Sequence, residues 1–275
     1  TEDGIGSCND SLSTHEDHEE RDRARMIVTG LDLLQWEGSI RVDPRHFTLR
    51  ISSYTRSQMW QQASVLFAAM PTISVQQNEF SFNAGLNAVA KGDQWQKSIS
   101  FLEAMSGMSI QPDVISFSSA ISSFEMANLW RTALTVFEDI SSTRTEPNVY
   151  TFSAAISSCE KAGRWEEALV LLKAMPSRSI QSNVISNNAV MSSCEKGSQW
   201  QPALSILSGL PSSRIPPDVV SISTAISSCE KCFEWKNALT LFLSLNAAKV
   251  SPNEFSFGAA ISSFEKSSQF HLALE

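Results

Sequence analysis

The feature that most constrains this chain is an internal repeat of 35 residues. The tetrad Ser-Ser-Cys-Glu begins at Ser157, Ser192 and Ser227, and the variant Ser-Ser-Phe-Glu begins at Ser122 and Ser262 on the same spacing. A tryptophan recurs at the same interval, at Trp60, Trp95, Trp130, Trp165, Trp200 and Trp235, with Phe270 in the next place. A period of this length, kept without insertion or deletion, predicts a stack of equivalent units, each of which contacts only its neighbours.

Each unit is expected to contain two helices. We number the repeat positions as columns 1–35, with column 1 at Pro44, Glu79, Val114, Val149, Val184, Val219 and Glu254, so that residues 44–275 form seven repeats and the last stops after column 22. Ser or Thr at column 3 predicts an N-cap, and the first helix runs to about column 13. A turn at column 15 and a second helix from the tryptophan column follow. Pro at column 34 is expected to end that second helix.

The ends of the chain differ from the repeats. Residues 1–25 carry −5 of the net charge of −8, which leaves −3 for residues 26–275. We interpret residues 1–25 as an acidic disordered tail and residues 26–43 as a degenerate repeat. The acidic total therefore does not exclude a basic stripe that nucleic acid could follow. The missing initial Met and the incomplete last repeat indicate a fragment of a longer protein, and no apolar run is long enough to cross a bilayer.

One side of the first helix is predicted to form the core. At 100° per residue, columns 4, 7, 8 and 11 share a face, and they are mostly apolar or small, with Asn187 as a departure at column 4. Cys159, Cys194 and Cys229 all fall at column 11 and are expected to be small buried side chains rather than disulfide partners.

The opposite side keeps a separate chemistry in each column. Column 2 is apolar or aromatic, at Phe80, Ile115, Tyr150, Ile185, Val220 and Phe255. Column 5 is small and hydrogen-bonding, at Thr48, Asn83, Ser118, Ser153, Asn188 and Ser223. Column 9 is Ser or Asn throughout. Column 35 is always Asn or Asp, at Asn78, Asp113, Asn148, Asn183, Asp218 and Asn253. Column 13 is basic in six of seven repeats, at Arg56, Lys91, Lys161, Lys196, Lys231 and Lys266.

These columns together predict a groove for single-stranded nucleic acid. Apolar groups sandwich bases, short polar groups read base edges, and cations meet phosphates. The alternative is purely structural: column 2 packs between repeats, and column 13 places Lys at the C-terminus of a helix, where its charge is favourable. Glu at column 12 is interpreted as a surface feature, because a ladder of identical acids is not an acid–base pair.

The period, the run Lys-Ala-Gly-Arg-Trp-Glu-Glu-Ala-Leu from Lys161 to Leu169, and the Pro-Asp-Val boundary at Pro112 and Pro217 resemble the pentatricopeptide repeat family over residues 44–275. The tetratricopeptide repeat differs, with 34 residues and another signature. The resemblance implies an all-α fold, a right-handed α-solenoid superhelix of helix-turn-helix repeats. It also implies a protein that is not an enzyme, needs no cofactor, acts on no small-molecule substrate, and binds single-stranded RNA in a chloroplast or mitochondrion, alongside other RNA-processing proteins.

The resemblance further implies that each repeat reads one base through columns 5 and 35, while column 2 sandwiches that base. Four pairs would favour A: Thr48 with Asn78, Ser118 with Asn148, Ser153 with Asn183, and Ser223 with Asn253. Two pairs would favour U: Asn83 with Asp113, and Asn188 with Asp218. With the N-terminus toward the RNA 5′ end, the implied site is 5′-AUAAUA-3′. Two positions depart from the pattern, since Arg45 occupies column 2 and Gly258 occupies column 5.

Other functions compete with RNA binding. Stacked helical pairs also form peptide grooves, so a protein-binding α-solenoid scaffold is the alternative; the cations at column 13 and the Asn or Asp at column 35 favour RNA. A nuclease or editing domain beyond Glu275 is neither supported nor excluded. Cys229 and Cys232 form a C-x₂-C without a second pair, and His15 and His18 lie in HEDHEE, not H-E-x-x-H, so no metal site is expected.

Overall fold

The computed structural model describes residues 43–142, 145–247 and 251–269. Across those ranges all regular structure is helical, with thirteen α-helices and one short 3₁₀ helix, η2 (Pro71–Ile73). The chain divides into two compact units, residues 1–123 and 124–275, and each is described by itself. The predicted acidic tail, and all but the last residue of the predicted degenerate repeat, lie outside the described residues.

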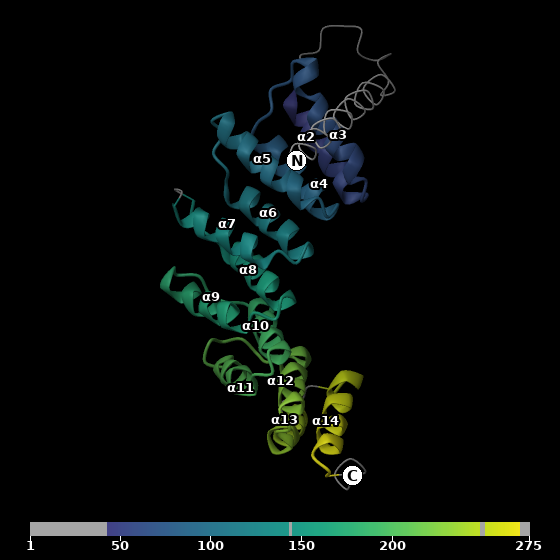
Figure 1. Cartoon of the computed structure of the whole chain (residues 1–275), viewed down its shortest axis with the longest axis vertical. Helices are drawn as coiled ribbons and strands as arrows, with labels where there is room; N and C mark the ends of the chain where they lie inside the picture. Colours follow the sequence, from purple (N-terminus) through teal and green to yellow (C-terminus); the bar gives the residue numbers. More distant parts are fainter. Residues whose placement is uncertain (1–42, 143–144, 248–250, 270–275) are drawn as a thin grey trace, which may run out of the picture. The chain divides into compact units, whose positions relative to one another are not determined.

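The helices follow the predicted period (Figure 1). The first helices of the repeats span columns 1–13: α2 (Pro44–Arg56), α4 (Glu79–Lys91), α6 (Val114–Met126), α8 (Val149–Lys161), α10 (Val184–Lys196), α12 (Val219–Lys231) and α14 (Glu254–Lys266). The second helices begin at the tryptophan column: α3 (Trp60–Ala69), α5 (Trp95–Gly107), α7 (Trp130–Ser142), α9 (Trp165–Ser177), α11 (Trp200–Gly209) and α13 (Trp235–Ala247). This arrangement confirms the all-α helical repeat solenoid. The predicted right-handed superhelix stays a prediction.

Neighbouring repeats pack through their first helices. In the first unit α2 contacts α3 and α4, and α4 contacts α5. In the second unit α8, α10 and α12 form a consecutive series, each also packed on its own second helix, and α14 packs on α12. First helices therefore form one continuous layer within each unit, with second helices beside them.

The predicted N-cap position is wrong by three residues. The cap is the Asn or Asp at column 35 of the preceding repeat, and the column 3 residue lies inside the first turn. Asn78 shows the geometry: its Oδ1 accepts from the Ser81 amide at 2.9 Å, and the Asn78 amide donates to Ser81 Oγ at 2.9 Å. This reciprocal capping box needs a hydroxyl three residues after the cap, which is why column 3 carries the capping signature without being the cap.

Each first helix ends at a left-handed residue at column 15, as the predicted turn requires. The φ angles there are all positive, at Gln58, Asp93, Asn128, Gly163, Ser198, Phe233 and Ser268. The next amide then bonds back to column 11, as from Arg164 to the Cys159 carbonyl at 2.8 Å. This six-to-one bond is the Schellman motif, which satisfies carbonyls that the helix end leaves free.

The second helices α5 and α9 end in the same way, whereas α3 and α11 end earlier, at Ala69 and Gly209, just before Pro71 and Pro211. Left-handed residues recur at column 31, at Ser74, Ser109, Ser179 and Arg214, and the following amide bonds back five residues, as from Ile110 to the Met105 carbonyl at 2.9 Å. The prediction that column 34 proline stops the helix is therefore wrong. Pro112 and Pro217 lie in the extended linker before the next cap, a conformation that proline and its preceding residue favour.

The core follows the predicted face of the first helix. Column 8 is fully buried in the first six repeats, and the column 20 alanines Ala168, Ala203 and Ala238 are also fully buried. The polar departure Asn187 is satisfied, because its Nδ2 donates to the Asn183 carbonyl at 2.8 Å and to Ser182 Oγ at 3.0 Å. Phe257 in α14 departs from the column 4 pattern with 48% of its surface exposed.

The column 11 cysteines are buried free thiols, as predicted. Cys159, Cys194 and Cys229 are each fully buried. Burial raises the pKa of the Cys159 thiol to about 12, that of Cys194 to about 11, and that of Cys229 to about 12. These thiols therefore stay protonated under ordinary conditions and act as small apolar side chains.

Replacing Phe233 by Gly should stabilise the protein. Phe233 has a φ of +61° and its side chain is 64% exposed, so the substitution removes backbone strain and little packing. We expect the free energy of unfolding to rise by about 0.5–1 kcal/mol, measured by urea denaturation. Phe233→Ala is the matched control, since it removes the ring but keeps the Cβ. Equal effects of both substitutions would contradict this explanation.

Stability should fall as pH rises above about 9. The folded pKa values of the three buried thiols lie above their ordinary value of 9.0, so the unfolded chain releases these protons first and gains from rising pH. The contribution is complete below pH 9 and is lost between about pH 9 and 12. Urea denaturation across this range should show a shallower decline for the Cys159→Ala, Cys194→Ala, Cys229→Ala variant. Identical slopes for the variant and the unmodified protein would be evidence against the thiols as the cause.

Candidate nucleic-acid interface

In six successive repeats the column 2 side chain of the first helix is apolar and exposed. The exposed fractions at column 2 are 70% for Phe80, 59% for Ile115, 73% for Tyr150, 68% for Ile185, 50% for Val220 and 54% for Phe255. Column 2 lies in the first helical turn, on the side opposite columns 4 and 8. Packing between repeats therefore does not account for these residues. Large exposed apolar groups at regular spacing are typical of a binding surface.

Asn83 and Asp113 form a hydrogen-bonded pair between columns 5 and 35. Asn83 Nδ2 donates to Asp113 Oδ1 at 3.1 Å, while Asn83 Oδ1 accepts from Ser116 Oγ at 2.5 Å. Asn188 and Asp218 repeat this arrangement, with Nδ2 to Oδ1 at 3.3 Å and Ser221 Oγ to Asn188 Oδ1 at 2.7 Å. Asn188 Nδ2 also lies 3.4 Å from Asp218 Oδ2.

The carboxylates of these pairs are charged at neutral pH. Burial opposes ionisation of Asp218, but hydrogen bonds from Ser221 and Asn188 outweigh it and lower the pKa of the carboxyl. The pKa of Asp113 is lowered in the same way, against burial, by bonds from Ser116, Glu79 and Asn83. Both residues therefore offer acceptor oxygens and no donor.

Glu79 makes the second repeat different from the fifth, although their pairs are identical. A hydrogen bond to Asp113, together with burial and the Asp113 charge, raises the pKa of Glu79. The equivalent residue in the fifth repeat is Val184. The second pair therefore carries an additional carboxyl that shares its hydrogen bonding.

The four predicted A-reading pairs are less uniform. Ser223 Oγ lies 3.5 Å from Asn253 Oδ1. Thr48 and Ser118 instead donate to the carbonyls of Pro44 and Val114, four residues earlier. Ser153 Oγ is buried without a hydrogen-bond partner among the described residues.

Four column 13 lysines are paired with the column 12 glutamate of the preceding repeat. The distances are 3.1 Å for Lys161–Glu125, 2.7 Å for Lys196–Glu160, 3.0 Å for Lys231–Glu195 and 2.9 Å for Lys266–Glu230. Sequence reasoning missed these pairs, although the signal was present: Glu at column 12 and Lys at column 13 recur together in the fourth to seventh repeats. Column 13 therefore has a structural partner as well as a predicted phosphate-facing role.

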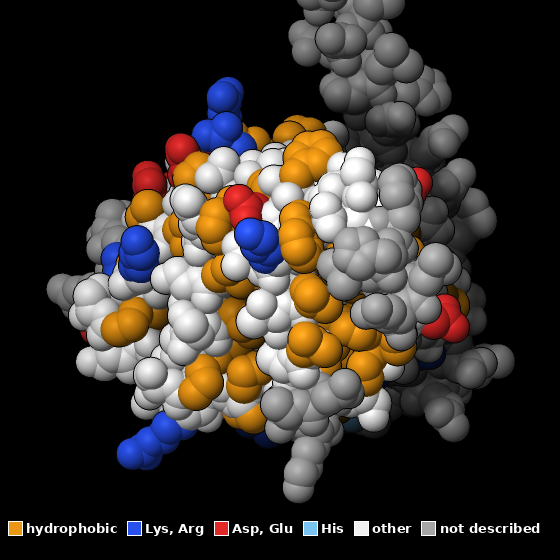
Figure 2. Space-filling view, turned by 90° about the horizontal axis from the view of Figure 1, so that it is seen from below, with side chains coloured by type: hydrophobic (Ala, Val, Ile, Leu, Met, Phe, Trp, Pro, Cys, Tyr) orange, Lys and Arg blue, Asp and Glu red, His pale blue; other side chains and the backbone are white. Residues whose placement is uncertain are grey.

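Cations do not merge into one patch on the face shown in Figure 2. There the described Lys and Arg side chains lie singly, some beside Asp or Glu, while hydrophobic side chains gather between them. The face shown therefore carries no continuous patch of described Lys and Arg side chains.

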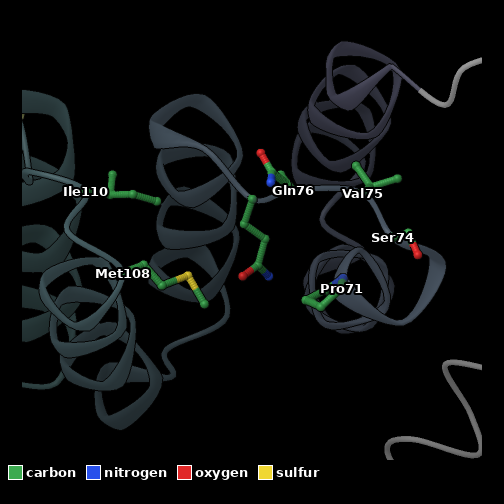
Figure 3. A pocket seen from close by; sticks show the side chains of 7 residues that line it. Pro71, Ser74, Val75, Gln76, Met108 and Ile110 are labelled. Atoms are coloured by element: carbon green, nitrogen blue, oxygen red, sulfur yellow. The ribbon is translucent and has the colours of Figure 1, made fainter.

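A concave feature lies at the loops of the first unit (Figure 3). Met108 and Ile110 line one side of this open hollow, and Pro71, Ser74 and Val75 line the other. Its lining contains no charged residue. Elsewhere, no cluster of potential metal ligands occurs in the described ranges, and no helix among them has the length and apolar character that a membrane span requires.

Comparison with known families identifies the repeat. The family described as PPR repeat matches residues 150–180, and the Pentatricopeptide repeat domain family matches residues 100–162. No curated protein matches the sequence.

Solved structures share the fold. The pentatricopeptide repeat protein PPR10 from maize is 14% identical, with 92% of this chain and 45% of that chain covered and a TM-score of 0.50. PPR10 in complex with an 18-nt psaJ RNA element is 21% identical, with coverages of 94% and 36% and a TM-score of 0.58. The PPR domain of Arabidopsis thaliana protein-only RNase P 1 in complex with tRNA is 12% identical, with coverages of 68% and 98% and a TM-score of 0.60. This chain thus spans less than half of the PPR10 chains.

Column 2 should contribute little to folding. Because Phe80 and Tyr150 are 70% and 73% exposed, Phe80→Ala and Tyr150→Ala should change the free energy of unfolding by no more than about 0.5 kcal/mol. Phe152 is fully buried, and Phe152→Ala should cost about 3–5 kcal/mol. Urea denaturation compares the three. A large loss for Phe80→Ala or Tyr150→Ala would show that column 2 serves packing.

Proposed function

We propose that this chain, which is an array of pentatricopeptide repeats, binds single-stranded RNA without catalysing a reaction. The observation that carries this proposal is the exposed apolar side chain of column 2, which recurs in six successive repeats and is accompanied by polar residues at columns 5 and 35 in five of them. A stripe of this kind stacks on bases, which have two apolar faces each, whereas a folded protein surface rarely offers groups at one regular spacing. RNA is also bound in two of the solved structures that share this fold.

The chemistry of column 35 supports a choice between bases. Asn78, Asn148, Asn183 and Asn253 use Oδ1 for the helix cap, so the amide N–H groups remain as donors. Asp113 and Asp218 offer acceptors only. On the Watson–Crick edge, the ring nitrogen of adenine accepts and that of uracil donates. Asn therefore suits A and Asp suits U, in agreement with the implied site 5′-AUAAUA-3′.

The remaining steps of the proposal come from the family. The protein would act in a chloroplast or mitochondrion and would occupy or expose a transcript segment for processing, stability, translation or editing, with other RNA-processing proteins as partners. Phe80, Tyr150 and their column 2 equivalents would sandwich the bases.

A protein-binding scaffold is the rival function. Column 13 and column 35 no longer separate the two, because the first pairs with glutamate and the second caps helices. Column 2 favours RNA, because each of the second to sixth repeats has one exposed apolar residue together with one pair at columns 5 and 35, as the recognition of one base per repeat would require. The binding measurement decides between them.

The whole chain should bind labelled RNA containing 5′-AUAAUA-3′ more tightly than a composition-matched scramble, as measured by fluorescence anisotropy. Replacing Asn83 by Ser and Asp113 by Asn should shift the preference at the second base from U to A. We expect the free-energy difference between binding RNA with U and RNA with A at the second base to change by about 1–3 kcal/mol, the usual cost of one mismatched base. The matched control recodes Asn188 and Asp218 in the same way and should affect only the fifth base.

The outcomes are distinct. Equal binding of the intended and scrambled RNAs would leave a non-specific RNA groove. No binding to either RNA at low salt would exclude the RNA function for this chain and favour a protein partner.

A further inference from the structure

The column 12 glutamates hold the column 13 lysines of the second unit in a regular network. Glu160 Oε1 accepts from Ser192 Oγ at 2.9 Å and from Lys196 Nζ at 2.7 Å. Glu230 Oε1 accepts from Ser262 Oγ at 2.8 Å and from Lys266 Nζ at 2.9 Å. One carboxylate thus engages columns 9 and 13 of the following repeat. Both columns lie on the side that was predicted to face RNA.

These contacts lower the attraction of the lysines for phosphate. The glutamate side chains are only 15–23% exposed, and the paired lysines are 37–42% exposed. A carboxylate about 3 Å away cancels most of the field of the ammonium group at longer range. To bind such a lysine, a phosphate must replace that carboxylate. A lysine that is already neutralised therefore releases fewer counterions from the RNA when it binds.

The cations of the first two repeats are not held in this way. Each lysine of the network pairs with column 12 of the preceding repeat; for Lys91 that residue is Thr55, and for Arg56 the position lies before the described residues. The Thr55 hydroxyl donates to the Ile51 carbonyl at 2.8 Å and carries no charge. Arg56 and Lys91, at column 13, are exposed and have no acidic partner in the described part of the chain.

We propose that Arg56 and Lys91 supply most of the phosphate contact, while the glutamates of the later repeats restrain their lysines. This inference rests on the proposed RNA-binding function. It divides the six cations into two classes, although the sequence pattern treats them as equivalent. With the N-terminus toward the RNA 5′ end, the electrostatic contact is concentrated at the 5′ side of the site.

The first experiment measures how RNA affinity depends on salt, by anisotropy with the whole chain. Neutralising Arg56 and Lys91 together (Arg56→Gln, Lys91→Gln) should reduce the log–log salt slope by about 1.4, since each contact to single-stranded RNA contributes about 0.7. Neutralising Lys196 and Lys231 together (Lys196→Gln, Lys231→Gln) should reduce it by less than half as much. Both variants lose two positive charges, so net charge does not distinguish them.

The second experiment releases the restrained lysines. In the Glu160→Gln, Glu195→Gln variant, the amide oxygen still accepts from Ser192 and Ser227, so the packing between repeats is kept while the ion pairs are lost. Affinity should rise, and the slope should steepen by up to about 1.4. Circular dichroism and thermal melting confirm that each variant is folded.

Each outcome is informative. Two results would overturn the inference while RNA binding by the unmodified chain stands. One is an equal slope reduction for the Arg56→Gln, Lys91→Gln variant and the Lys196→Gln, Lys231→Gln variant. The other is no gain in RNA affinity from the glutamate substitutions. Absence of RNA binding by the unmodified chain would instead overturn the proposed function itself.

Discussion

Left-handed residues at columns 15 and 31 fix the period on which every other feature depends. Wherever the structure describes these columns within a repeat, the chain takes a positive φ and the next amide bonds back five residues. The first helices therefore end at a set position, and every helix begins at the same column in each repeat. Because the count is the same in each repeat, equivalent side chains fall in register. The core columns, the exposed apolar stripe and the Glu–Lys network are all consequences of that register.

The regular features were predictable from the sequence, and the contacts between repeats were not. The helix boundaries and buried columns followed from periodicity and helix geometry, which are local. The N-cap was placed at Ser81 and its equivalents instead of Asn78 because a capping box contains two polar partners, and the sequence does not say which precedes the helix. The pairing of Lys196 with Glu160 joins residues 36 positions apart. Only the packing of α8 against α10 brings them together.

The polar columns show that structural and ligand-binding roles are not exclusive. Asp218 caps α12 of the next repeat, bonds to Asn188 of its own repeat and retains a charge. Ser192 belongs to a column predicted to face RNA, yet its hydroxyl contacts Glu160. A column with constant chemistry is therefore weak evidence for a ligand when the fold also uses it. Exposed apolar residues such as Tyr150 are stronger evidence, since folding gives no reason to keep them.

The capping role of column 35 limits how such an array could be reprogrammed. The residue proposed to select a base must also accept the amide hydrogen bond that starts the next helix, a contact worth about 1 kcal/mol. Only Asn, Asp, Ser and Thr do this well, so the usable alphabet at this position is short. Replacing that residue by a long hydrophobic or basic one would weaken one helix N-cap for each repeat that is changed. Changes would accumulate along the array, and a heavily rewritten protein would lose rigidity before it lost its ability to recognise RNA.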